Sequence, residues 1–145
     1  MTRALVNAAR GWIGTPYMHQ AAVKGAGCDC LGLLRGVWAD VFGAEPEKVP
    51  SYTADWSEPQ GRELLFEAAC RHMTPLTDTP LQSGQVLLFR MRQGAVAKHL
   101  GILAEAGVVP TFIHAYAGHG VIESPLSAPW RRRIAARFAV SEGTY

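Results

Sequence analysis

Residues 27–43 read GCDCLGLLRGVWADVFG, and this stretch predicts one buried helix that begins at a cysteine. Asp29 is a typical N-cap residue, and Gly43 is a typical C-terminal stop. Between them the apolar side chains lie at helical spacing and form one stripe: Cys30, Leu33, Leu34, Val37, Trp38 and Val41. Because such a stripe must be buried, we expect the Cys30 thiol in the first turn of a helix that packs against the rest of the fold.

Two further helices are expected in the first half of the chain. Apolar side chains at helical spacing predict an opening helix that ends at residues 14–16: Leu5, Val6, Ala9, Trp12 and Ile13. A loop rich in glycine and alanine follows this helix through Gly27. Residues 44–59 predict a surface excursion, and a third helix is expected from Pro59 to about His72.

Beyond Pro80 the pattern changes to short apolar runs, separated mostly by Gly or Pro, that predict β-strands. The runs are residues 85–91, 99–104, 111–116, 120–124 and 132–140. Helices come first and strands afterwards, and the links between strands are too short for crossover helices. We therefore expect an α+β fold with an antiparallel sheet of about five strands, in a single domain that spans residues 1–145.

Composition excludes several classes of protein. Of the 145 residues 48% are hydrophobic and 18% are charged, and the net charge of +2 offers no stripe for nucleic acid. No apolar run approaches the ~18 residues of a membrane span, and the N-terminus lacks the apolar core of a secretory signal. We therefore expect synthesis as a soluble cytosolic protein. The three cysteines, Cys28, Cys30 and Cys70, are too few and too oddly spaced for a disulfide framework, which leaves a thiol free for chemistry.

Cys30 is the candidate nucleophile. A thiolate in the first turn of a helix faces unpaired main-chain N–H groups and the positive end of the helix dipole, which can lower its pKa from ~8.5 into the range of roughly 3.5 to 7.5. The same N–H groups can stabilise an oxyanion, an effect worth about 2.7 to 4 kcal/mol per donor. The alternative is that Cys30 is only a small buried hydrophobic residue.

A cysteine nucleophile needs a base, and His99 stands at the start of a predicted strand. His99, Gly101 and Leu103 share a face of that strand, and the small Gly101 would let a neighbouring element come close. His114 on the next strand can hydrogen-bond to the His99 ring and orient it, and His119 remains an alternative for that role. Each histidine alone would more simply be a hydrogen-bonded core or surface residue.

Four short motifs, in order along the chain, resemble the NlpC/P60 family. Its hallmark is Asp-Cys-x-Gly-Leu at a helix start, then a His-x-Gly strand, then a polar residue on the following strand. Residues 29–33, residues 99–101 and His114 match in that order, and Gly-Thr-Pro-Tyr at residues 14–17 is similar to the family's Gly-x-Pro-Tyr segment. The resemblance covers residues 5–140, and four motifs on elements of the right type make it fairly specific.

This resemblance implies a papain-like α+β fold, with N-terminal helices packed on a C-terminal antiparallel sheet, and the activity of a cysteine peptidase. Cys30 would be the nucleophile, His99 its base and His114 the orienting group. Tyr17 and Asp29 would serve the oxyanion and substrate, with the Tyr17 hydroxyl near the thiol. The resemblance implies neither a metal nor another cofactor.

The substrate implied by the resemblance is a peptidoglycan stem peptide, cut between D-γ-glutamate and a diamino acid. Residues 28–38 look like the branch of the family found in phages and phage-like particles, which would carry the enzyme to the wall, with tail or particle proteins as further partners. The chain departs from the family pattern at Leu31, where serine is frequent. It also has an extra thiol at Cys28, either a bystander or a redox partner of Cys30.

Three alternatives remain from the sequence. A zinc site is possible from the residue types, but Cys28 and Cys30 lack the usual ligand spacing and have no second pair. A non-enzymatic assembly module of a particle would use residues 130–133 for docking to a partner or an anionic wall polymer. An amidase or acyltransferase would use the same cysteine, because a fold does not fix a substrate.

Overall fold

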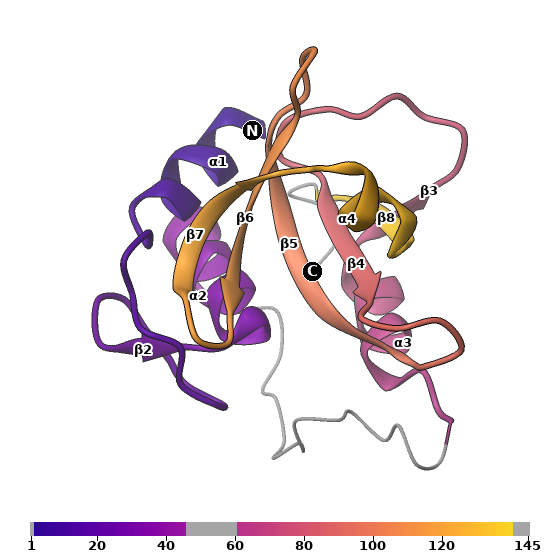
Figure 1. The fold of residues 1–145 in the computed structure, drawn as a ribbon. Helices are drawn as coiled ribbons and strands as arrows, with labels where there is room; N and C mark the ends of the chain where they lie inside the picture. Colours follow the sequence, from indigo (N-terminus) through magenta and orange to yellow (C-terminus); the bar gives the residue numbers. More distant parts are fainter. Residues whose placement is uncertain (1, 46–60, 141–145) are drawn as a thin grey trace.

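The computed structural model describes residues 2–45 and 61–140, and it has helices packed on an antiparallel sheet of six strands (Figure 1). The strand order in this sheet is β3-β8-β4-β5-β6-β7, and β1 and β2 form a separate small hairpin. The elements are α1 (Thr2–Arg10), β1 (Ala22–Val23), β2 (Gly27–Cys28), α2 (Cys30–Phe42), α3 (Leu64–His72), β3 (Thr74–Leu76), β4 (Val86–Arg90), β5 (Ala97–Glu105), β6 (Thr111–Tyr116), β7 (Gly120–Pro125), α4 (Ala128–Arg132) and β8 (Ile134–Ala139).

Helix α2 forms as the sequence predicts. The Asp29 carboxylate accepts a hydrogen bond from the main-chain N–H of Gly32 at 2.7 Å, which satisfies one of the unpaired donors of the first turn. The helix ends at Gly43, which has a left-handed conformation with φ of 88° and donates its N–H to the carbonyl of Ala39. The expected α+β class, with helices first and antiparallel strands afterwards, is confirmed.

The sheet is covered on both faces, because successive side chains of a strand point to opposite sides. On one face, Leu88 and Ile102 belong to the main core, which includes the apolar stripe of α2. On the other face, Leu87, Phe89 and Phe112 form a smaller cluster against which Trp130 of α4 packs. The inner strands are therefore almost continuously buried, and the position of a side chain in the sequence decides which cluster it joins.

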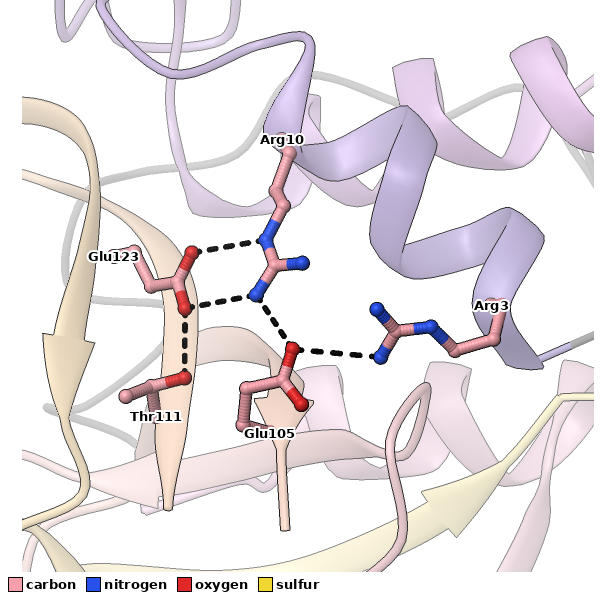
Figure 2. A network of polar contacts seen from close by, with 5 residues as sticks. All are labelled: Arg3, Arg10, Glu105, Thr111 and Glu123. Carbon is pink, nitrogen blue, oxygen red and sulfur yellow. Dashed lines mark hydrogen bonds and ion pairs between the residues drawn. The ribbon is translucent and has the colours of Figure 1, made fainter. Parts of the chain in front are cut away.

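An ion-pair network ties α1 to the far strands of the sheet (Figure 2). Arg10 contacts Glu105 at the end of β5 at 2.7 Å and Glu123 of β7 at 3.1 Å. Thr111 of β6 donates its hydroxyl to Glu123 at 2.7 Å, and Arg3 reaches Glu105 at 3.4 Å. The buried side chains of α1 join the main core, so the network fixes the outer side of a helix that is already held by packing.

The structure corrects the prediction in three places. The sheet has six strands rather than about five, because β3 is only three residues long and contains Pro75, which suits an edge strand but hides it from pattern reading. Short helix α4, with a proline in its first turn, replaces the expected link before the last strand. The described part of the third helix begins at Leu64, and its predicted start at Pro59 lies outside the described residues.

No helix among the described residues is both long enough and apolar enough to cross a membrane.

Candidate active site

Cys30 is the first residue of α2, and its side chain points at strand β5. Only 7% of the residue is exposed. The thiol donates to the carbonyl oxygen of Lys98 at 3.6 Å, and the main-chain N–H of Leu100 also faces the sulfur. The sulfur therefore lies against the main chain on both sides of His99.

A β-bulge shapes β5 at this point. Phe89 of β4 pairs with His99, but the next residue, Arg90, pairs with Ala97, so Lys98 is an extra residue in the ladder. Bulges of this kind redirect side chains and are common beside active sites. Glu63 accepts the N–H of Ala97 at 2.9 Å and also binds Arg90, which fixes the strand just before the bulge.

Two histidine rings lie side by side on the face of the sheet opposite to the one on which α2 and Cys30 pack. Nε2 of His99 is 2.8 Å from Nδ1 of His114, and Nε2 of His114 is 2.9 Å from the hydroxyl oxygen of Ser124. His99 is 7% exposed and His114 is fully buried. The structure thus brings together the two histidines that the sequence pairs, and it adds a serine from β7.

Aromatic side chains surround the histidine pair. The ring of Trp130 lies 5.7 Å from that of His99 and 5.2 Å from that of His114, measured between centroids. Phe89, Phe112 and Tyr116 complete the cluster. Gly101 has the close neighbour that the sequence predicts, since a side-chain carbon there would lie 2.7 Å from Cδ2 of Phe112.

Burial keeps the thiol and both imidazoles uncharged at neutral pH. It lowers the pKa of His99 to about 3, with a smaller contribution from His114. It lowers the pKa of His114 to about 4, with a smaller contribution from His119. Burial, followed by the charge of Asp29, raises the pKa of Cys30 to about 12, and the nearby main-chain N–H groups only partly oppose this. The expectation of a lowered thiol pKa is therefore wrong for the resting site, because burial outweighs the helix N-terminus.

Comparison with known proteins decides the family. The sequence profile of the NlpC/P60 family matches residues 14–138. The chain belongs to the NlpC/P60 family. This is a family of cysteine peptidases that act as peptidoglycan hydrolases, and the cysteine at a helix start beside a histidine-bearing strand fits that chemistry.

Solved structures of NlpC/P60 proteins share the fold. The NlpC/p60 domain of the peptidoglycan hydrolase SagA is 27% identical, with a TM-score of 0.60 over 97% of this chain and 98% of that one. An NLP/P60 family protein similar to lipoprotein, from Staphylococcus aureus subsp. aureus Mu50, is 19% identical with a TM-score of 0.65, over 98% of this chain and 42% of that one. A family member from Bacillus cereus ATCC 10987 is 19% identical with a TM-score of 0.63, over 94% of this chain and 39% of that one. This chain thus spans less than half of the latter two proteins. No curated protein sequence matches it significantly.

Tyr17, the residue that the NlpC/P60 resemblance places near the nucleophile, lies on the loop that pairs with Cys28. Its side chain is at the surface, with 37% exposed. Burial raises the pKa of Tyr17 to about 12, with smaller contributions from the negative charges that Cys30, Asp29 and Cys28 carry when ionised. The phenol thus remains a neutral hydrogen-bond donor at neutral pH, and its expected role toward the oxyanion or substrate stays a prediction.

Asp29 is 3% exposed and has both oxygens occupied. One oxygen accepts from Gly32, and the other accepts from the main-chain N–H of Gln20 at 2.7 Å, with His19 3.8 Å away. These bonds hold the loop that carries Tyr17 against the start of α2. The structure thus gives Asp29 a structural task at the site, and its expected contact with substrate stays a prediction.

Two other cysteine and histidine candidates take distinct places. His119 is exposed in the turn after β6 and stacks on Tyr116 at 5.2 Å, so His114 rather than His119 hydrogen-bonds to His99. Cys28 is fully buried in β2, and burial raises its pKa to about 11. Among the described residues no group of three or more His, Cys, Asp or Glu side chains is placed to hold a metal ion.

Ser124 and Trp130 are the site residues that sequence reasoning missed. Ser124 ends a predicted strand, but its bond to His114 depends on the register of β6 and β7, in which Ile122 is the direct partner of His114. The sequence suggests Trp130 only as a docking residue, whereas its ring packs against the histidine pair. A tryptophan beside predicted strands was the only available signal.

Proposed function

We propose that this chain hydrolyses a peptide bond of peptidoglycan stem peptides, between D-γ-glutamate and a diamino acid, with Cys30 as nucleophile and His99 as base. The observation that carries this proposal is the place of the Cys30 sulfur, at the start of α2 and against the main chain on either side of His99. The domain of the peptidoglycan hydrolase SagA, similar over nearly its whole length, supports the substrate class.

The first step of the proposed mechanism is a proton transfer. Nε2 of His99 is bonded to His114, so Nδ1 is the nitrogen that takes the proton from the Cys30 thiol. For this transfer the Cys30 side chain has to leave the Lys98 carbonyl and turn toward this nitrogen, because the His99 ring packs with Phe89 on the other face of the sheet. Substrate binding favours this rotation, because the thiolate then gains an electrophilic carbonyl carbon as its partner.

The thiolate next attacks the peptide carbonyl carbon and forms a carbon–sulfur bond. The resulting oxyanion is stabilised by the main-chain N–H groups of Cys30 and Leu31, which face the sulfur, and by the Tyr17 hydroxyl. Protonated His99 gives its proton to the leaving amine as the carbon–nitrogen bond breaks. Water, deprotonated by the neutral His99, then hydrolyses the thioester and restores the thiol.

A comparison of two cysteine variants tests this proposal. Purified peptidoglycan is incubated with the wild type, with Cys30→Ala and with Cys70→Ala, and the fragments are identified by mass spectrometry. Cys70 is exposed on α3 and serves as the matched control. We expect new amino termini on the diamino acid with the wild type and Cys70→Ala, and none with Cys30→Ala. If none of the three proteins cleaves peptidoglycan, the chain is instead an assembly module. Cleavage by Cys30→Ala at the wild-type level would contradict the role of Cys30 as nucleophile, and cleavage at another bond would indicate an amidase.

We also propose that a phage or phage-like particle carries this enzyme to the wall. The support is the resemblance of residues 28–38 to the phage branch of the family. Mass spectrometry of purified particles from an induced culture tests the proposal. A particle that contains its tail proteins but lacks this chain would contradict it.

A further inference from the structure

Ser124 is the third member of a hydrogen-bonded chain that starts at the candidate base. The chain runs from Nε2 of His99 to Nδ1 of His114 over 2.8 Å, and from Nε2 of His114 to Oγ of Ser124 over 2.9 Å. Ser124 stands on β7, whereas the two histidines stand on β5 and β6, so three neighbouring strands each contribute one member. Each of the two contacts holds a single hydrogen atom, which links the protonation of all three groups.

We propose that Ser124 is a positioning residue that fixes which nitrogen of His114, and through it of His99, carries the proton. This inference rests on the proposed function, in which Nδ1 of His99 must be bare in order to take the thiol proton. When Oγ of Ser124 accepts from Nε2–H of His114, Nδ1 of His114 is bare and accepts from Nε2–H of His99. Nδ1 of His99 then has its lone pair available.

If the hydrogen bonds of this chain run in the opposite direction, His99 cannot act as the base. If the Ser124 hydroxyl donates to Nε2 of His114, the proton of His114 sits on Nδ1 and is donated to His99. The proton of His99 then sits on Nδ1, where the thiol proton has to go. The hydrogen bonds alone allow both directions, because a hydroxyl donates as well as accepts.

The partial exposure of Ser124 is compatible with the productive direction. Ser124 is only partly buried, so its hydroxyl hydrogen can point to water when its oxygen accepts from His114. In the opposite direction this hydroxyl hydrogen is committed to His114, and the proton of His99 occupies the Nδ1 position that the thiol proton needs. The proposed function therefore requires the direction with Ser124 as acceptor.

Removal of the Ser124 hydroxyl is expected to favour the opposite direction of the hydrogen bonds. In Ser124→Ala, Nε2–H of the fully buried His114 loses its acceptor. The pair avoids that loss by moving both protons to the Nδ1 positions, so that His114 donates to His99. Ser124→Ala is therefore expected to flip both tautomers, whereas Ser124→Thr keeps the hydroxyl and retains them.

The test reads the tautomers directly. Long-range ¹H–¹⁵N correlation spectra of the full chain, labelled at histidine and recorded at neutral pH, distinguish Nδ1–H from Nε2–H rings. We expect Nε2–H for His99 and His114 in the wild type, in Ser124→Thr and in Ser127→Ala, and Nδ1–H for both in Ser124→Ala. Ser127 is an exposed serine three residues away, and its side chain makes no capping hydrogen bond. Unchanged tautomers in folded Ser124→Ala would overturn the proposal.

Kinetics provide the second readout. Loss of the base tautomer is expected to lower kcat of peptide cleavage about tenfold in Ser124→Ala, with KM unchanged and with recovery in Ser124→Thr. A rise in KM with kcat unchanged would overturn the positioning role. The spectra need no substrate, so they decide the tautomer question even if the wild type cleaves no peptidoglycan and the proposed function fails.

Discussion

The buried histidine pair is expected to make the stability of the fold sensitive to mild acid. Unfolded histidines bind a proton near a pKa of 6.5, whereas burial lowers the pKa of His99 to about 3 and that of His114 to about 4. Below pH 6.5 the unfolded state therefore holds more protons than the folded state. Stability is fully present above pH 6.5 and falls as the pH drops toward the pKa values of the folded protein.

The size of this effect follows from the two pKa values. At pH 5 each unfolded histidine lies 1.5 units below its pKa of 6.5, which is worth about 2 kcal/mol, and the folded pair is still neutral. The pair should therefore remove about 4 kcal/mol from the free energy of unfolding between pH 8 and pH 5. The carboxylates contribute little in this window, because it ends above their ordinary pKa values.

Urea unfolding at pH 8 and pH 5 measures the effect. The double variant His99→Gln/His114→Gln should lose about 4 kcal/mol less than the wild type over this interval, whatever its stability at pH 8. His119→Gln, which replaces an exposed histidine, is the matched control and should behave like the wild type. If the double variant and the wild type lose equal stability, the two imidazoles are not held neutral by burial, and the reasoning fails.

Three further substitutions test the supports of the site. Trp130→Ala removes a partly buried ring that packs on His99 and His114, so it should lower the free energy of unfolding by about 2 kcal/mol and also lower kcat/KM. A fully active variant would contradict the idea that this ring supports the histidine pair. Arg10→Ala breaks ion pairs whose side chains are a quarter to a half exposed, so it should lower the free energy of unfolding by about 1 kcal/mol or less. This loss should be smaller in high salt, and activity should be unchanged. In Gly36→Ala the new carbon would lie 2.1 Å from the Trp12 ring, which should lower the free energy of unfolding by about 1 to 3 kcal/mol, whereas Gly107→Ala in open space should be neutral.

The sequence predicts those parts of the fold that are specified by residues close together in the chain. The apolar stripe, Asp29 and Gly43 all lie within residues 29–43, and together they specify α2 with its cysteine at the first position. The pairing of His99 with His114 follows from two neighbouring strands joined by a short connection. Strand β3 escaped prediction because three residues that include Pro75 carry almost no pattern.

Other features of the site arise only from tertiary contacts. The bulge at Lys98 is a mismatch between β4 and β5, and no residue within β5 announces it. The bond from Ser124 to His114 depends on register across β6 and β7. The raised pKa of Cys30 depends on how completely α2 and β5 exclude water from the thiol, and a helix N-terminus read from sequence gives the opposite sign.

The uncharged resting site follows from the same burial that positions the candidate catalytic groups. Ionising Cys30 alone, or protonating His99 alone, places an unpaired charge in the interior, and this is why the thiol pKa rises while the imidazole pKa falls. The proposed transfer of one proton from Cys30 to His99 would create both charges together, and their mutual attraction in a medium of low dielectric would offset part of the desolvation. His114 adds to this offset when its Nδ1 accepts from protonated His99. In the proposed mechanism the charged pair forms only when sulfur and ring face each other, so movement of the Cys30 thiol away from the Lys98 carbonyl would be the step that activates the nucleophile.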